Sequence, residues 1–186
     1  VWDDEVAWLQ VGTDAADRFV LTTNDPVPSA SSIGTIQARE IGAGQTALSN
    51  AMTITHQGVE QVELDTRGGD DRFAVKAIHT KTTINAGSGS DAIYLGSNAT
   101  LGGLGQADSN SEGKLNAINA GLTVNGQGSG DNDLLDLDDT GDDAASAHGT
   151  LTSTRISNGV AGSPAGLILF GANGSIGYGS LEALAI

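Results

Sequence analysis

The most regular pattern of hydrophobic and polar positions lies between Thr66 and Leu95, which reads TRGGDDRFAVKAIHTKTTINAGSGSDAIYL. One phrase occurs twice in it: a glycine, any residue, an aspartate, any residue, and then alternating apolar positions. The two aspartates, Asp71 and Asp91, are 20 positions apart. Such a fixed period is typical of architectures in which each repeat forms one coil. We therefore expect an all-β fold, a parallel β-helix or β-solenoid with turns of roughly 20 residues.

Three short segments carry the apolar alternation after an acidic corner: Phe73–Val75, Ile93–Leu95 and Leu135–Leu137. Alternate residues of a strand point to opposite faces, so the outer pair of each segment points the same way. Stacked in parallel, these pairs would form continuous apolar columns inside a coil. A single coil cannot bury its own apolar face, so neighbouring coils are required.

Other segments repeat the corner with changes. Asn125–Leu137 matches Asn85–Leu95 if Gly130 and Asp131 are counted as an insertion. Asp17–Leu21 resembles the corner at Asp71. The polar, glycine-rich segment 96–114 has little pattern, and we expect it to be an excursion from the coil.

The end of the chain resembles an internal segment. Ile176–Ile186 matches Ile54–Leu64 without a gap, and this alignment places Glu182 opposite Glu60. An acidic corner follows Leu64, whereas the sequence stops at Ile186.

The first residues offer a match for that corner, because Asp3–Trp8 aligns with Asp70–Val75. One copy would then continue another head to tail, as in a module of a tandem array or a subunit of a filament. A short amphipathic capping helix over residues 1–11 is an equally good interpretation, because Trp2, Val6 and Leu9 have nearly helical spacing.

These patterns indicate one β-solenoid module over residues 1–186. Its first part is 1–64, its best-patterned core is 65–137, and 138–186 would supply the last rungs and the C-terminal strand. We expect no helix after residue 11. The alternative is a β-sandwich adhesin domain, for which the regular spacing of the corners would be accidental.

Composition and charge narrow the function. The chain contains 27 glycines and 4% aromatic residues, which suits tight turns and a core of small aliphatic side chains. Its 23 acidic residues against 8 Lys and Arg give a net charge of −15. No basic stripe exists to neutralise phosphates, which argues against nucleic acid as a partner. No apolar run approaches the roughly 18 residues of a membrane span.

Aspartate beside glycine-rich turns points to cation chemistry. Such turns expose backbone carbonyls, and Ca²⁺ takes six to eight oxygen ligands from carboxylates and carbonyls. Stacked corners would otherwise bring like charges to about 4.8 Å, the spacing between strands. In the alternative interpretation, glycine serves only conformation and aspartate only accepts hydrogen bonds from loop amides.

The segment Ala86–Tyr94 resembles the repeats-in-toxin nonapeptide G-G-x-G-x-D-x-U-x, which binds Ca²⁺ in a parallel β-roll. It departs from this motif only at Ala86, which stands in place of the first glycine. The resemblance implies that glycine carbonyls and aspartate carboxylates of three corners are ligands: Gly87, Gly89 and Asp91, then Gly69 and Asp71, then Gly128 and Asp133. Acidic neighbours complete the candidate metal site: Asp70, Asp131, Asp136, Asp138 and Asp139. A solvated charge run is the alternative for Asp136, Asp138 and Asp139.

As a whole, the chain resembles the repeat regions of large bacterial surface and adhesin-like proteins, which alternate a GDD-x-F-x-V corner with a GVE-x-L-x-I strand. This resemblance implies an extracellular or cell-surface structural protein whose partners are neighbouring modules or copies of itself. We expect no enzymatic activity, because the three histidines lack zinc-ligand spacing and no nucleophile motif is present. The alternative is a carbohydrate-binding or polysaccharide-cleaving β-helix with surface glycans as partners. That function needs exposed aromatics on one face, and the candidates are Trp2, Trp8, Tyr94 and Tyr178.

Overall fold

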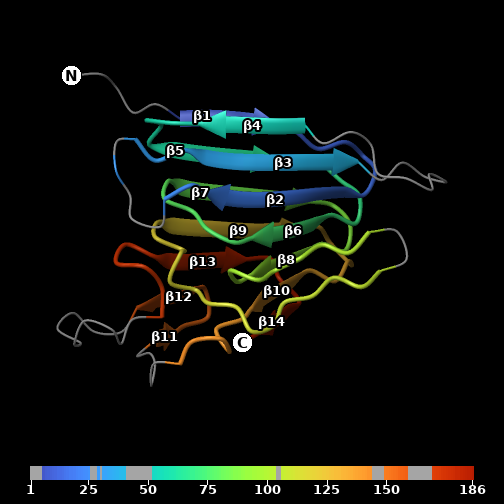
Figure 1. Ribbon diagram of the computed structural model, residues 1–186. Coiled ribbons are helices and arrows are strands. Elements are labelled where there is room, and N and C mark those ends of the chain that lie inside the picture. The colour runs from blue at the N-terminus through green and yellow to red at the C-terminus, as the bar shows by residue number, and fades with distance from the viewer. Residues whose placement is uncertain are drawn as a thin grey trace.

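A computed structural model describes residues 6–25, 29, 31–40, 52–103, 106–143, 149–158 and 169–186. Fourteen strands and no helix occur in this part of the chain, which confirms the prediction of an all-β protein. The strands form two mixed sheets of seven strands each (Figure 1). The described residues accordingly contain no helix that could cross a membrane.

The first sheet, here sheet A, lies behind the second in Figure 1. Its strand order is β1-β5-β7-β9-β13-β12-β11, and its first five strands run parallel. Its strands are β1 (Val6–Gln10), β5 (Gln61–Asp65), β7 (Lys81–Gly87), β9 (Gly121–Gln127), β13 (Ser175–Gly179), β12 (Arg155–Asn158) and β11 (Gly149–Leu151).

The second sheet, here sheet B, has the order β14-β10-β8-β6-β2-β3-β4, and its strands from β14 to β2 run parallel. Its strands are β14 (Ala183–Ala185), β10 (Leu134–Leu137), β8 (Ala92–Leu95), β6 (Arg72–Val75), β2 (Asp17–Thr23), β3 (Gly34–Glu40) and β4 (Met52–His56).

The chain alternates between the sheets, so that a strand of sheet A is followed by a strand of sheet B five times among the described residues. We call a strand of sheet A together with the strand of sheet B that follows it a rung. Rungs 1 to 5 are β1–β2, β5–β6, β7–β8, β9–β10 and β13–β14. Gln61 pairs with Lys81 and Arg72 with Ala92, so rungs 2 and 3 are offset by the spacing that the repeated corner predicts. The sheets share one core, an arrangement that the coiled and the sandwich interpretations have in common.

Apolar columns run through this core, as the alternation predicts. Phe73 lies in register with Phe19 on one side and with Ile93 on the other, and Ile93 with Leu135. All four side chains are fully buried, and the rings of Phe19 and Phe73 stack with centroids 4.9 Å apart. The column therefore joins four consecutive rungs.

Two insertions extend the sheets by antiparallel pairs. After rung 1 the chain forms β3 and β4, which lengthen sheet B beyond β2. After rung 4 it forms β11 and β12, which lengthen sheet A beyond β13. Counted by rungs, sheet B therefore has two strands beyond the β1–β2 rung, and sheet A has two strands beyond the β13–β14 rung.

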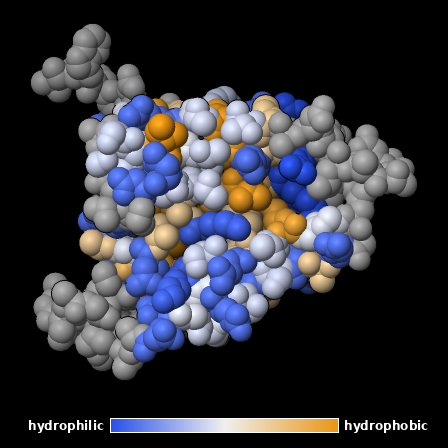
Figure 2. All heavy atoms as spheres, in the orientation of Figure 1, coloured by the Kyte–Doolittle hydropathy of each residue, from blue (hydrophilic) through white to orange (hydrophobic). Residues whose placement is uncertain are grey.

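The segment 96–114 contains no strand among its described residues and crosses the outer face of sheet B. The carboxylate of Asp108 lies 3.0 Å from an amino nitrogen of Arg18 and 3.6 Å from Nε of Arg72. Asn110 donates hydrogen bonds to the carbonyls of Leu95 and Asp136. The predicted excursion thus contacts four neighbouring strands. Figure 2 shows this face as a mixture of polar and apolar residues.

Two sequence alignments are wrong. Ile176 lies in sheet A in register with Leu122, whereas Ile54 lies in sheet B, so the two matched segments are not structural equivalents. Val6–Gln10 lies in register with Gln61–Asp65 of sheet A and not with a corner of sheet B. It is a strand and not a helix, while residues 1–5 lie outside the described part. Both errors arise because apolar alternation looks the same in either sheet.

Candidate metal centre

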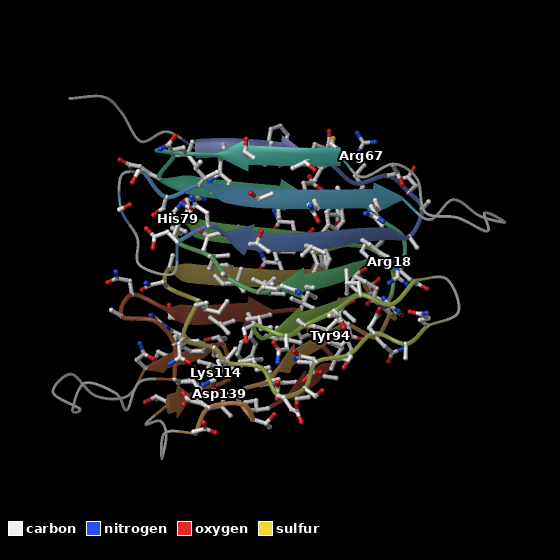
Figure 3. All side chains as sticks on the ribbon, viewed as in Figure 1. Arg18, Arg67, His79, Tyr94, Lys114 and Asp139 are labelled. Carbon is white, nitrogen blue, oxygen red and sulfur yellow. The ribbon has the colours of Figure 1, made fainter. Side chains whose placement is uncertain are left out.

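An acidic residue stands at the same place in every rung, where the chain enters sheet B. The register of the strands aligns these five residues with one another, so they form a column along one side of the molecule. In Figure 3 this is the side of Arg18 and Arg67, opposite His79. Four members are at most 3% exposed and the fifth is exposed: Asp17, Asp71, Asp91, Asp133 and Glu182.

Hydrogen bonds connect the column from rung to rung. The backbone N–H of Asp17 donates to Oδ1 of Asp71 at 2.7 Å, and that of Asp71 donates to Oδ1 of Asp91 at 2.8 Å. The N–H of Asp91 donates to Oδ1 of Asp133 at 2.9 Å, and that of Asp133 to Oε2 of Glu182 at 2.8 Å. Each of the four acids after Asp17 therefore accepts a hydrogen bond from a backbone donor of the previous corner.

The second carboxylate oxygen of the three central acids accepts no hydrogen bond. Oδ2 of Asp71, Asp91 and Asp133 is buried and has no hydrogen-bond partner. A buried carboxylate oxygen without a hydrogen-bond partner is energetically costly, because burial removes it from bulk solvent. The column therefore has unused capacity for a proton or a cation.

The pKa values follow from this environment. Burial, with a smaller contribution from the charges of Asp91 and Asp17, raises the pKa of Asp71 to about 8, although the backbone N–H of Asp17 and the side chain of Thr66 act in the opposite direction. Burial likewise raises the pKa of Asp91 to about 7, with Asp133 adding to the effect. The pKa of Asp133 is raised by burial and by the charges of Asp131 and Glu182. At neutral pH the charged column is therefore unfavourable without counter-charge.

At rung 4 the column widens into a cluster of three acids. Oxygens of Asp131, Asp133 and Glu182 lie within 4.8 Å of one another. Oδ1 of Asp131 and Oδ2 of Asp133 are both buried without a hydrogen-bond partner. Asp133 is 0% exposed, whereas Glu182 is exposed and leaves the cluster accessible to solvent. Among the described residues this is the one acidic or histidine cluster with such geometry.

Glycine makes room for this cluster. A Cβ atom added to Gly126 would lie 2.0 Å from the carbonyl oxygen of Ser180 and 2.1 Å from Oδ2 of Asp133. These two oxygens therefore converge on the same small space. A Cβ atom at Gly128 would lie 1.3 Å from Oδ2 of Asp131. The available donors are all oxygens, which suits a hard cation such as Ca²⁺.

The predicted insertion supplies one of these acids. Gly87 pairs with Gln127, whereas Ala92 pairs with Leu134, so the spacing between partners increases by two positions from the first pair to the second. The insertion therefore lies between these pairs, where the sequence places Gly130 and Asp131. Asp131 has no counterpart in the shorter corner before Asp91.

The other predicted corner residues lie beside the column. Asp70 is exposed, and its Oδ1 accepts a hydrogen bond of 2.8 Å from the N–H of Ser90. Gly69, Gly87 and Gly89 have positive φ angles of 107°, 93° and 122°. A Cβ atom at Gly89 would lie 2.3 Å from the carbonyl oxygen of Gly69. These glycines thus allow the corners to approach closely.

The remaining three predicted acids are separate from the cluster and contact the 96–114 segment or the residues next to it. Asp136 lies on β10, and burial raises its pKa. Asp138 accepts hydrogen bonds from Gly113 and Thr140. Burial alone would raise the pKa of Asp138, but these hydrogen bonds outweigh burial, and the pKa is lowered. Asp139 accepts a hydrogen bond of 2.9 Å from the N–H of Leu115 and lies near Lys114 in Figure 3. These carboxylates fix loops.

Sequence reasoning missed Glu182, because the gapless alignment placed it opposite Glu60. A usable signal existed: Glu182 precedes Leu184 by two positions, as Asp133 precedes Leu135. It also missed a histidine pair. The rings of His56 and His79 stack with centroids 5.6 Å apart, and Nδ1 of His79 lies 2.8 Å from the hydroxyl of Thr23.

The described aromatics do not line one face. Trp8 lies on β1 and Tyr178 on β13 of sheet A, four strands apart, and Tyr94 lies on β8 of sheet B. Trp2 lies outside the described residues.

No protein-family model, no curated protein and no solved structure matches this chain. The class of protein therefore has to be inferred from the fold and from the acidic column alone.

Proposed function

We propose that the chain is a non-catalytic structural module, a parallel β-solenoid of five rungs whose acidic column takes up divalent cations, with Ca²⁺ as the resident ion. The observation that carries the proposal is the acidic column, in which each acid after Asp17 accepts a backbone hydrogen bond from the previous rung. Its three central acids, Asp71, Asp91 and Asp133, each keep one buried oxygen without a hydrogen-bond partner. A cation at the rung 4 cluster would supply the missing counter-charge and tie rungs 4 and 5 together.

Strand pairing favours the solenoid over the sandwich. Among the described residues, eight of the twelve strand pairs are parallel, and they connect successive rungs. β-Sandwiches are built mainly from antiparallel hairpins and Greek keys. In this chain the four antiparallel pairs belong to the two insertions at the ends.

An extracellular or cell-surface location, in an adhesin-like repeat protein, follows from the same interpretation. Free Ca²⁺ outside cells is abundant enough to fill sites of modest affinity, for which Kd values of about 10⁻⁴–10⁻³ M are typical of extracellular modules. The partners in this proposal are further copies or neighbouring modules. Antibody labelling of intact source cells tests the location, and labelling only after lysis would contradict it.

The metal proposal is tested by calorimetric titration of the EDTA-treated protein with CaCl₂ and by its thermal melting. At a Ca²⁺ concentration of 100 times Kd, mass action adds about 2.7 kcal/mol to the free energy of unfolding. For a chain of this size that is a rise of about 5–10 °C in the melting midpoint. Mg²⁺ should have a smaller effect, because it demands a tighter octahedral shell.

Variants locate the site. Asp131→Asn removes an acid of the cluster and should abolish the Ca²⁺-dependent rise. Asp14→Asn removes the same charge from an exposed position outside the cluster and should preserve it. If wild type binds no Ca²⁺ and melts at the same temperature in EDTA and in Ca²⁺, the column holds protons and the metal proposal is wrong, while the solenoid stands.

A further inference from the structure

Counted by rungs, the two ends of the molecule are complementary steps. At the β4 end, sheet B has two strands, β3 and β4, beyond the β1–β2 rung; at the β11 end, sheet A has two strands, β12 and β11, beyond the β13–β14 rung. If a second copy is placed at the β11 end of the first, its β4 lies opposite β12 of the first copy and its β3 lies opposite β11. Both sheets then continue without a missing or surplus strand.

Strand direction also matches across this joint. β11 is antiparallel to β12, which is antiparallel to β13, so β11 runs in the direction of β13 and of β1. By the same reasoning β4 runs in the direction of β2 and of β14. The pairs β11–β1 and β14–β4 between copies would therefore be parallel, like the pairs between rungs.

The exposed large apolar side chains of the described residues lie at these same ends. They are Trp8 on β1, Met52 on β4, Leu151 on β11 and Ile186 after β14, with exposed fractions of 63%, 45%, 56% and 71%. Met52 pairs with the buried Ala38, and Leu151 with the buried Ile156, so both belong to the inner faces of their sheets.

In the described part of the chain, a pocket of about 430 Å³ lies at the β11 end of the core. It is lined mainly by apolar side chains, including Leu151, Ile156 and Ile186. Uncovered edge strands with apolar side chains are sites of further strand addition, and native monomers protect such edges with charges or proline. Of the described residues in β1, β4, β11 and β14, none is Lys, Arg, Asp, Glu or Pro.

From these observations we propose that the β14–β11 end of one copy binds the β1–β4 end of a second copy, so that both sheets run continuously through an open, head-to-tail stack. The inference deepens the end-to-end association of the structural module proposed above and rests on that function, but it does not depend on the metal.

The register of the core fixes which residues meet. The column through Leu135 runs from Leu184 to Met52, so Leu184 of one copy meets Met52 of the next. On the outer face, the column through Asp136 runs from Ala185 to Thr53. These two small, exposed residues would thus lie about 4.8 Å apart across the joint.

A cysteine pair tests this register. The chain has no cysteine, so a Thr53→Cys/Ala185→Cys variant reports only the designed contact. A Cα separation of about 5 Å permits a disulfide. The variant is oxidised in EDTA and in Ca²⁺, in about 0.5 M salt because the net charge of −15 repels copies at low ionic strength. Non-reducing electrophoresis should show a ladder of dimers, trimers and longer species under both metal conditions.

Matched variants exclude other contacts. Each single variant should stay uncrosslinked, and so should Thr53→Cys/Gln106→Cys, whose second cysteine lies in the exposed loop over sheet B. Sedimentation of the chain without cysteines should show concentration-dependent association that Met52→Lys abolishes and Gln106→Lys leaves unchanged.

Two results would overturn the proposal. A dimer from Ala185→Cys alone would show a symmetric contact of two β14 edges, which closes and cannot propagate. Monomers at every concentration, for both the cysteine pair and the unmodified chain, would show that the steps do not join. A ladder that persists in EDTA, with no Ca²⁺ binding by calorimetry, supports the joint and rejects only the metal.

Discussion

The acidic column makes one prediction that runs against intuition: removing a charge from its centre should stabilise the protein. Asp91→Asn keeps an oxygen that can accept the hydrogen bond from the N–H of Asp71, but removes the negative charge at a site that is 1% exposed. The neutral side chain no longer repels Asp133 or carries the cost of burying a charge.

The magnitude follows from the pKa of Asp91, which burial raises to about 7 from an ordinary 3.8. The folded state then binds a proton more tightly than the unfolded state, so stability is present at low pH and is lost as the pH rises from 3.8 to about 7. Above that window the charged group costs at most about 4 kcal/mol. Coupling to the rest of the column divides this cost among several acids.

The assay is thermal melting of wild type and Asp91→Asn in EDTA between pH 5 and pH 8.5. The difference between the variant and wild type should grow with pH and reach several degrees above pH 7, since 1 kcal/mol corresponds to about 2–4 °C here. Asp14→Asn, at an exposed position, should show a small difference that does not follow this curve. In Ca²⁺ the variant should lose its advantage, because the cation neutralises the wild-type column.

An Asp91→Asn variant that melts well below wild type at pH 8 in EDTA would refute the reasoning. It would mean that the ionised carboxylate is favourable in the column, and that the unused oxygens have partners which the fold supplies.

Three further predictions concern the corners, the histidine pair and the core. Gly87→Ala should lower the free energy of unfolding, measured by urea titration, by more than about 1–3 kcal/mol, because the φ of Gly87 is 93° and the new Cβ would lie 2.0 Å from a carbonyl oxygen. Gly103→Ala, where the new Cβ would meet open space, should change this free energy little. Burial lowers the pKa of both His56 and His79, so their contribution to stability falls as the pH drops below 6.5. The His79→Gln variant should therefore be more stable relative to wild type at pH 5 than at pH 8. An equal difference in stability at both pH values would contradict this. Phe73→Ala should cost about 3–5 kcal/mol in urea unfolding, because its ring is fully buried and stacks in the column, and a cost below about 1 kcal/mol would place it outside a rigid core.

Much of the repeating part follows from the sequence. The spacing of Asp71 and Asp91 predicts the length of a rung, and the insertion before Asp133 is confirmed by the strand register. These features are local: a corner needs glycine and an acid, and a strand needs alternation. The sequence therefore predicts the positions of the corners at rungs 1 to 4.

Which sheet a strand joins is not local, and there the sequence misleads. Ile54 and Ile176 have apolar neighbours at the same spacing, yet they lie in different sheets, because Ile54 belongs to the antiparallel pair β3–β4 inserted after rung 1, whereas Ile176 belongs to β13 of rung 5. Glu182 was missed for this reason. The stacking of His56 on His79 likewise depends on where β4 docks, which no spacing within either segment encodes.

The contacts of the 96–114 segment have a consequence for the order in which the molecule comes apart. Through Arg18, Arg72 and Asn110 this one loop fastens strands that are as far apart in the sequence as β2 and β10. A single protease cut within the loop would leave every hydrogen bond between strands in place, but it would weaken the contacts that the loop makes across sheet B. Limited digestion should therefore yield two fragments that remain associated but separate at lower denaturant concentration than the uncut chain unfolds.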